Sequence, residues 1–154
     1  MEQTNIFKLI HAIEKMNNHN IIQFTKEFPY PLGISPILVL SELHHKGPQK
    51  QVELAETIGY TKGAMTNIAN KLENLKLVNR VDDEHDKRAN YLSITTEGEK
   101  ALQTAQKIGE KVFVELFKVL TEDEINQYLT IQEKLINGIQ KKILIRRDSY
   151  DKTS

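Results

Sequence analysis

Hydrophobic positions recur at helical spacing over most of this chain and alternate with period two in one short stretch. Apolar residues at offsets of three and four over 5–28 predict an amphipathic helix, with irregularity expected at its polar run 17–20. The proline- and glycine-rich stretch 29–33 ends it. A second, more apolar helix is predicted to follow, with Ser35 as its N-cap, Pro36 in its first turn and its end before the next Gly-Pro pair. Such a helix is expected to pack beneath its neighbours.

Two helices separated by a turn at Gly59 are predicted in the middle of the chain. The first, 52–58, has an apolar stripe at helical spacing. Thr61 is suited to cap the second, 61–75, because its hydroxyl can accept a hydrogen bond from a free amide of the first turn. The apolar residues of this second helix are predicted to face the core: Met65, Ile68, Ala69, Leu72 and Leu75.

The opposite face of helix 61–75 is polar, and its charges are all positive. It carries Lys62, Gly63, Thr66, Asn67, Asn70, Lys71 and Asn74. Side chains of these kinds bind phosphates and base edges, so the face suits a DNA major groove. The more ordinary explanation is a solvated helix in a helical domain. The strand-loop-strand pattern that follows favours DNA recognition, because a plain helical bundle needs no such hairpin.

Two short antiparallel strands are predicted at 77–81 and 90–94, where hydrophobic and polar residues alternate. The loop between them, 82–88, is too long for a tight turn and too charged to bury, which is typical of a wing. The predicted fold class is therefore mainly α (α+β), a winged helix-turn-helix with additional N- and C-terminal helices.

This part of the chain resembles the multiple-antibiotic-resistance regulator (MarR) family of bacterial transcription factors. The resemblance rests on the order and spacing of Glu53-Leu54-Ala55, Leu72-Glu73, Leu77-Val78 followed by Arg80, Asp86-Lys87-Arg88, and Ile94-Thr95 with Gly98 beyond. It implies a homodimer that binds a pseudo-palindrome in double-stranded DNA, usually as a repressor released by a small-molecule effector or by oxidation. It also implies that Arg88 reaches the minor groove while Asp86 holds its guanidinium. A forked cation suits the negative potential of a narrow A·T-rich minor groove.

We therefore predict DNA contacts from Thr61, Lys62, Gly63, Thr66, Asn67, Asn70, Lys71, Asp86 and Arg88. Two positions depart from the family pattern. Lys76 stands where the family usually has glycine, so a left-handed helix end there would carry a steric cost, and the helix end is expected to differ from the family's. Asn67 stands where arginine is common. Because asparagine favours adenine over guanine, it points to an A·T-rich operator.

After the second strand, either Thr95 or Thr96 is predicted to cap a long helix, and the Thr96 choice would form a capping box with the glutamate three residues on. A second capping box, Thr121 with Glu124, is predicted to open a last helix, with 150–154 as a frayed tail. The terminal helices carry more apolar surface than one winged domain can cover, which favours an intertwined dimer interface.

The predicted division of the chain has three parts: an N-terminal dimerisation helix and linker (1–34), the winged DNA-binding domain (35–95) and C-terminal dimerisation helices (96–154).

The formal net charge is zero, with 21 basic and 21 acidic residues, but the charge is unevenly distributed. From 61 to 80 four basic residues oppose one glutamate, a local charge of +3. From 81 to 91 four acidic residues oppose two basic ones, a local charge of −2. The predicted reading helix therefore attracts phosphate, whereas most of the wing repels it. We expect DNA affinity that falls as the salt concentration rises.

Several functional classes are disfavoured by what the sequence lacks. There is no cysteine, which excludes disulfides, thiolate metal sites and thiol-based peroxide sensing. No nucleophile elbow, phosphate-binding glycine loop or metal-ligand motif is present, so no enzyme activity and no cofactor are predicted. Without a long apolar run or a signal-peptide pattern at the N-terminus, a cytoplasmic protein with no membrane partner is expected.

Three alternatives remain open. Glu42, His44 and His45 lie close together, but zinc needs three or four converging ligands, so solvated histidines are favoured over a metal site. Some aromatic residues could line an effector pocket, although core packing is the commoner role: Phe24, Phe28, Tyr30, Phe113 and Phe117. A protein-interaction adaptor that kept the winged fold without DNA binding is the competing function. The acidic wing favours it, and the polar-basic helix face argues against it.

Overall fold

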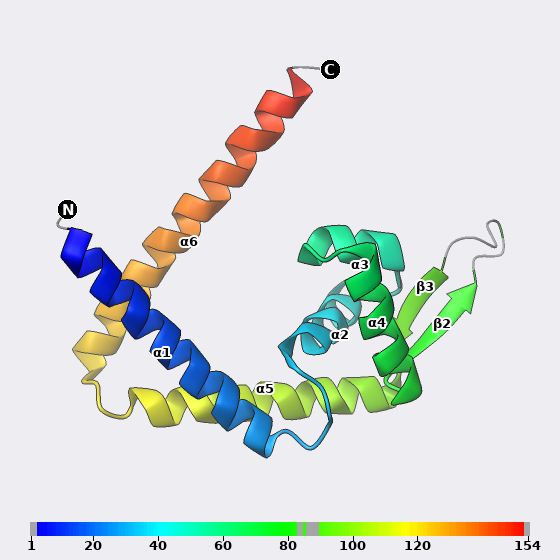
Figure 1. Cartoon of the computed structure of the whole chain (residues 1–154), viewed down its shortest axis with the longest axis horizontal. Coiled ribbons are helices and arrows are strands. Elements are labelled where there is room, and N and C mark those ends of the chain that lie inside the picture. The colour runs from blue at the N-terminus through cyan, green and yellow to red at the C-terminus, as the bar shows by residue number, and fades with distance from the viewer. Residues whose placement is uncertain (1–2, 83–84, 86–89, 153–154) are drawn as a thin grey trace. The chain divides into compact units, whose positions relative to one another are not determined.

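A computed structural model describes residues 3–82, 85 and 90–152 (Figure 1). The chain divides into two compact units, Met1–Val112 and Phe113–Ser154. Its elements, in order, are α1 (Gln3–Glu27), α2 (Ile34–Lys46), β1 (Gln49–Lys50), α3 (Gln51–Ile58), α4 (Lys62–Asn74), β2 (Val78–Asp82), β3 (Asn90–Ile94), α5 (Thr96–Phe117) and α6 (Glu122–Asp151). The predicted mainly α winged-helix fold is confirmed. In the part of the chain described here, no helix is both long and apolar enough to span a membrane.

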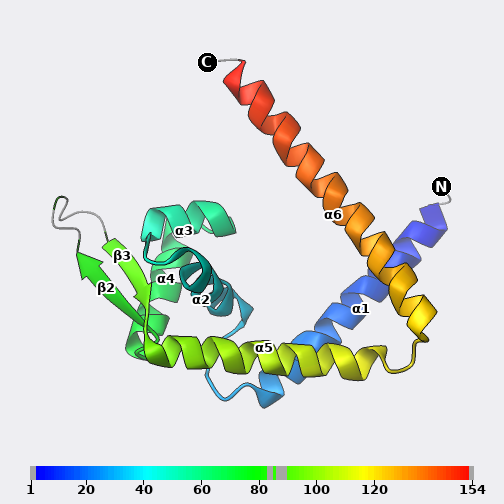
Figure 2. The same cartoon turned by 180° about the vertical axis from the view of Figure 1, so that it is seen from behind.

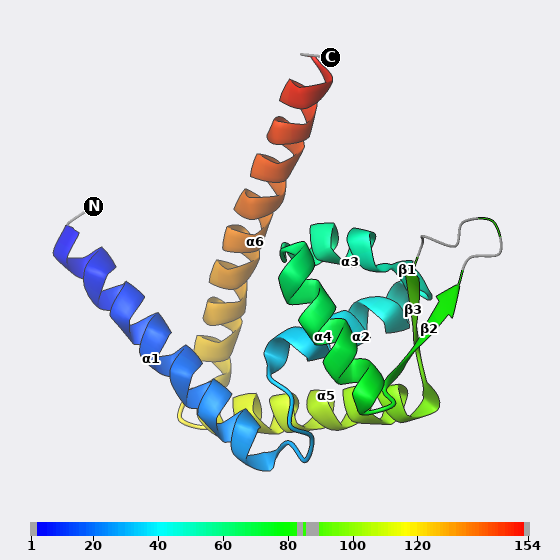
Figure 3. The ribbon, with the colours of Figure 1, turned by 45° about the vertical axis from the view of Figure 1, so that its right-hand side comes forward.

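The sheet is antiparallel, with strand order β1-β3-β2. β2 and β3 pair in the register Val78 with Ile94 through Asp82 with Asn90, close to the two strands that the alternation predicts. The sequence did not predict β1, because two residues are too few for period-two alternation to be seen. Its residue Gln49 pairs with Leu92 at the centre of β3, so β1 fixes the start of α3 to the sheet. Figure 3 shows the three strands beside α3 and α4.

The core of the first unit is formed by buried residues of α2, α3, α4, the sheet and α5, and α5 runs below the helix-turn-helix in Figure 2. The predicted inward face of α4 is confirmed, because Met65, Ala69 and Leu72 have no exposed surface. Leu40 of α2 and Leu92 of β3 are equally buried. Burying one such leucine or methionine side chain contributes about 1.5–3 kcal/mol, so these contacts hold the orientation of α4 firmly.

Two predictions about the first helices are wrong in detail. α1 is continuous through the polar run 17–20, where irregularity was expected. α2 begins at Ile34, with Gly33 at its N-cap position and no capping side chain. Ser35, the predicted cap, lies inside the first turn, and its hydroxyl oxygen accepts a hydrogen bond from the Tyr60 hydroxyl at 2.7 Å. The serine therefore joins α2 to the turn before α4.

Thr95, the first of the two candidates, is the cap of α5. Its hydroxyl oxygen accepts from the Gly98 amide at 3.0 Å and donates to the Lys76 carbonyl at 2.7 Å. The capping box expected for a cap at Thr96 does not form, because the Glu99 carboxylate lies 2.6 Å from Nδ1 of His44 instead. One threonine thus fixes both the start of α5 and the chain that leaves α4.

The predicted capping box at the start of α6 is confirmed. The Thr121 amide donates to Glu124 Oε1 at 3.0 Å, and the Glu124 amide donates to Thr121 Oγ1 at 3.2 Å. The backbone hydrogen bond from Thr121, with a smaller contribution from its side chain, lowers the pKa of Glu124. α6 continues to Asp151, so the tail predicted from 150 begins later than expected. No proline or glycine near this end interrupts the helix.

Because a left-handed lysine carries a steric cost, the end of α4 was expected to differ from the family pattern, but Lys76 adopts a left-handed conformation with φ of 60°. The Lys76 amide donates to the Glu73 carbonyl and the Leu77 amide to the Leu72 carbonyl, both at 2.9 Å. These two bonds form a Schellman motif, with the buried side chains of Leu72 and Leu77 accompanying it. The helix therefore ends in the geometry that suits glycine, although a lysine occupies the position.

Replacing Lys76 with glycine is expected to raise the free energy of unfolding by about 1 kcal/mol, because a left-handed non-glycine residue costs roughly 1–2 kcal/mol. Urea melts of the wild type and Lys76→Gly measure the difference. Lys107→Gly, in the middle of α5, is the control and should lower stability by about 0.5–1 kcal/mol. A destabilised Lys76→Gly variant would contradict the expectation.

Candidate nucleic-acid interface

The outer face of α4 is open to solvent. All the predicted DNA contacts on this helix and its cap are exposed: Thr61, Lys62, Gly63, Thr66, Asn67, Asn70 and Lys71. Thr61 is the N-cap, as predicted, since its hydroxyl oxygen accepts a hydrogen bond from the Ala64 amide at 3.1 Å. The helix thus presents a polar face outward while its apolar face is buried, with its N-terminal amides and positive dipole end next to Lys62.

Arg80 of β2, to which the sequence assigned no role, contacts residues of this face and of α3. Its Nη2 donates to Asn70 Oδ1 at 2.7 Å and its Nη1 to Gln51 Oε1 at 3.1 Å. Its Nε also donates to Glu73 Oε2, which makes an ion pair. The Arg80 side chain is 28% exposed. It therefore ties β2 to both α3 and α4.

Gln51 extends this network to Thr66. The Gln51 Nε2 donates to Thr66 Oγ1 at 3.0 Å, and the Thr66 hydroxyl donates to the Lys62 carbonyl at 2.8 Å. Gln51 had no signal in the sequence, because its position at the start of α3 comes near Thr66 only in the folded chain. For Arg80 the family motif was a signal, but it gave the residue no partner.

The pairing of Arg80 changes the charge of the candidate interface. The sequence count of +3 for 61–80 stands as a sum, but Arg80 and Glu73 neutralise each other locally. In the described part of the chain, Lys62 and Lys71 have no ion-pair partner and remain exposed. These two lysines, rather than Arg80, are therefore available to phosphates. The predicted wing residues Asp86 and Arg88 lie outside the described residues.

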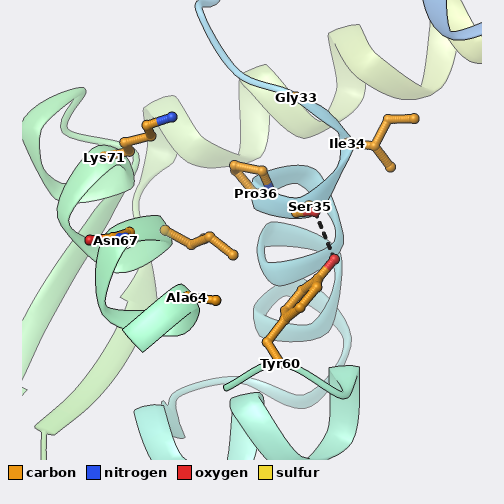
Figure 4. A pocket seen from close by; sticks show the side chains of 9 residues that line it. Gly33, Ile34, Ser35, Pro36, Tyr60, Ala64, Asn67 and Lys71 are labelled. Atoms are coloured by element: carbon orange, nitrogen blue, oxygen red, sulfur yellow. Dashed lines mark hydrogen bonds between the residues drawn. The ribbon is translucent and has the colours of Figure 1, made fainter. Parts of the chain in front are cut away.

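A pocket of about 370 Å³ lies between the start of α2 and one side of α4 (Figure 4). Asn67 and Lys71 line it from α4, opposite Gly33 and Pro36, and the bond between Tyr60 and Ser35 crosses its wall. None of the aromatic residues considered for an effector site lines this pocket. These residues make other contacts. Phe28 is buried in the core, with Phe24 and Tyr30 packed against the same cluster. Phe113 and Phe117 contact each other in the second unit.

The histidines considered for a metal site have protein partners. Nδ1 of His44 lies 2.6 Å from the Glu99 carboxylate, and Nδ1 of His45 lies 2.8 Å from the Ser41 carbonyl oxygen. Within the described residues, no group of three or more histidine, aspartate and glutamate side chains could hold a metal ion. These contacts instead join the C-terminal end of α2 to its own last turn and to α5.

Comparison with known proteins matches residues 34–89 to the model of the MarR family. The HTH-type transcriptional repressor MdtR of Bacillus subtilis is 30% identical over 110 residues, which cover 70% of this chain and 71% of MdtR. This chain belongs to the MarR family. The transcriptional regulator HosA of Escherichia coli is 28% identical over 130 residues, 84% of this chain and 96% of HosA.

The fold agrees with that of solved MarR-family structures. A mutant MarR from Escherichia coli, crystallised with operator DNA, has a TM-score of 0.69 at 23% identity, with 88% of this chain and 98% of that chain covered. As a MarR-family protein, this chain is a DNA-binding transcriptional regulator with a winged helix. The exposed polar face of α4 lies within the matched segment 34–89. This face is the candidate surface for DNA contact.

Proposed function

We propose that this MarR-family protein is a homodimeric repressor that binds a pseudo-palindromic operator and is released from it by a small molecule. One observation carries the proposal: every predicted contact residue on α4 is exposed, while Met65, Ala69 and Leu72 of the same helix have no exposed surface. A regulator of this kind acts where the DNA is, in the cytoplasm. The repressor activity named for MdtR supports this direction of regulation.

In this proposal α4 enters the major groove with its N-terminal end towards the phosphate backbone. Lys62 and the free amides of the first turn attract phosphate. Gly63 has open space where a Cβ would be, so a DNA strand can approach it closely. Asn67 is proposed to contact adenine, as its amide can both accept from N6 and donate to N7. Arg88, held by Asp86, is proposed to reach the minor groove beside it.

A second copy of the chain is proposed to cover the exposed apolar faces of the terminal helices. On α1, Leu9 and Ile13 are 53% and 44% exposed, and on α6, Ile139 and Ile143 are 59% and 48% exposed. Apolar rows of this length are rare on monomers and mark protein interfaces. The segments 1–34 and 96–154 then serve dimerisation, and the two α4 helices meet successive major grooves about 34–36 Å apart.

The pocket beside α4 is the proposed site for an effector. It shares Asn67 and Lys71 with the DNA-facing helix, so a molecule held there would engage side chains that the operator also needs. Binding would favour the DNA-free form by its difference in affinity between the two forms. Loss of operator binding in the presence of the effector is the expected consequence.

Exchanging both Lys62 and Lys71 for glutamine is expected to weaken operator binding and to flatten its salt dependence. Because each phosphate contact contributes about −0.9 to the slope of log K against log salt, losing two contacts in each subunit of the dimer should reduce the slope by about 3.6. Mobility-shift titrations between roughly 50 and 200 mM salt with DNA from upstream of the protein's own gene measure both effects. An unchanged slope would contradict the assignment of the two lysines.

The control for this experiment is Lys111→Gln. Lys111 lies on α5 and pairs with Glu27 of α1 at 3.3 Å, so its loss should leave the slope unchanged. The same titrations decide between the regulator and the adaptor without DNA binding. If the folded wild-type protein shifts no DNA even at the lowest salt, the adaptor is the better description.

A further inference from the structure

We infer that Arg80 fixes the hydrogen-bonding polarity of the DNA-facing side of α4, so that Asn70 presents its NH2 donors and Thr66 an acceptor to the bases. The inference rests on the proposed insertion of α4 into the major groove and adds to it the base preference of two positions. Arg80 is a positioning residue in this account, since it acts through Asn70 and Gln51 rather than on DNA.

The orientation of the Asn70 amide follows from the chemistry of arginine. A guanidinium has five N–H donors and no acceptor, so the Asn70 atom that lies 2.7 Å from Arg80 Nη2 must be its carbonyl oxygen. This partner removes the usual ambiguity between the oxygen and nitrogen of an asparagine amide. The Asn70 NH2 group is then directed away from Arg80, and Asn70 is exposed. Its two donors are the part of the amide that faces away from Arg80 and can meet DNA.

Donors facing the major groove discriminate between base pairs. Guanine presents two acceptors there, N7 and O6, and thymine presents O4. The usual pairing of asparagine with adenine instead needs the amide oxygen to accept from the adenine N6 group. Arg80 takes one of the two lone pairs of that oxygen and holds the oxygen towards itself, which disfavours the paired contact with adenine N6 and N7. Adenine offers the NH2 group only N7, next to its own N6 donor, whereas guanine offers N7 and O6 and thymine offers O4. Asn70 should therefore favour guanine, or thymine, over adenine.

Thr66 is restricted in the opposite sense. Its single hydroxyl proton goes to the Lys62 carbonyl at 2.8 Å, and one lone pair accepts from Gln51 Nε2 at 3.0 Å. The remaining lone pair can only accept, which suits adenine N6 or cytosine N4, while the methyl group suits the thymine methyl. The Gln51 amide is itself oriented because its oxygen faces Arg80 Nη1. One arginine therefore sets the polarity at both positions.

Asn67, one turn earlier than Asn70, has no such restraint. Within the described residues its side chain forms no hydrogen bond, so its amide can turn to suit adenine. The face of α4 would thus combine the adaptable amide of Asn67 with two side chains of fixed polarity, those of Thr66 and Asn70. A role of Arg80 in stability alone predicts no effect on which bases are chosen, and this difference makes the inference testable.

The test selects binding sites from random double-stranded DNA with the wild type, Asn70→Ala, Asn70→Asp, Arg80→Met and the control Lys111→Met. Asn70→Ala identifies the base pair that Asn70 reads, as the position where preference disappears. There we expect the wild type to prefer guanine or thymine over adenine by about tenfold, in line with a good base contact. With Arg80→Met the amide is free, and the ratio should fall towards one. Lys111→Met should select the wild-type sites.

Asn70→Asp keeps an oxygen for Arg80 but has no donors, so its preference at that position should disappear or move to cytosine or adenine. If circular dichroism shows that Arg80→Met does not fold, Asn70→Asp alone tests the inference. Adenine chosen by the wild type, or an unchanged preference with Arg80→Met or Asn70→Asp, would overturn the inference. If the wild type enriches no sequence at all, the proposed function itself fails, and that outcome is distinct.

Discussion

Replacing Gly98 with alanine is expected to lower the free energy of unfolding by about 3 kcal/mol, the upper part of the range for overpacked sites. A Cβ at Gly98 would lie 2.1 Å from the Leu77 carbonyl oxygen and 2.7 Å from Ile94 Cγ1. The carbonyl cannot easily move away, because it accepts a hydrogen bond from the Thr95 amide at 3.0 Å. Thermal melts should show a midpoint lower by about 6–12 °C.

Gly109→Ala is the matched control, on the same helix. Nothing lies within 4 Å of a Cβ at Gly109, so alanine there should raise stability by about 0.5–1 kcal/mol through helix propensity. A Gly98→Ala variant as stable as the wild type would contradict this expectation, because it would show that the sheet and α5 can move apart without a loss of stability. Because Leu77 immediately precedes β2 and Ile94 is the last residue of β3, we expect operator binding to weaken along with stability.

Placing aspartate at both Ile139 and Ile143 is expected to convert the proposed dimer to monomer and to reduce operator affinity by at least about 100-fold, since linked half-sites gain roughly 10²–10⁴ in affinity. Each isoleucine contributes about 1.5–3 kcal/mol when buried, and a dimer loses four of them. The two residues are one turn apart on α6 and are about half exposed in the single chain. Light scattering at micromolar concentration and mobility shifts measure the two effects.

The control for the dimer experiment is Thr130→Asp with Asn137→Asp, which adds the same charge on the opposite side of α6. At 100° per residue these positions lie about 160–180° from Ile139, and both are exposed. They should leave the dimer and its operator affinity intact. If the isoleucine variant stays dimeric, the apolar face of α6 is not the interface, and another surface must join the two copies.

The helices and the wing strands were predictable because their signals are local. The buried face of α4 follows from the spacing of Met65, Ile68 and Leu72, and the caps at Thr61 and Thr121 follow from a threonine at the start of an apolar run. The start of α2 at Ile34 was not predictable in the same way. A serine before a proline is a local cap signal, but the Tyr60 hydroxyl, 25 residues away, bonds its oxygen in the fold.

The sequence by itself determined the winged-helix class and the outward polar face of α4, because the signals for each element lie within a few positions of one another. Only the tertiary structure decided that β1 joins the sheet, that Gly98 is needed for close approach, and that Arg80 holds Gln51, Asn70 and Glu73. These features join residues from different elements. Their physical basis is a distance in space, which hydrophobic spacing along the chain does not encode.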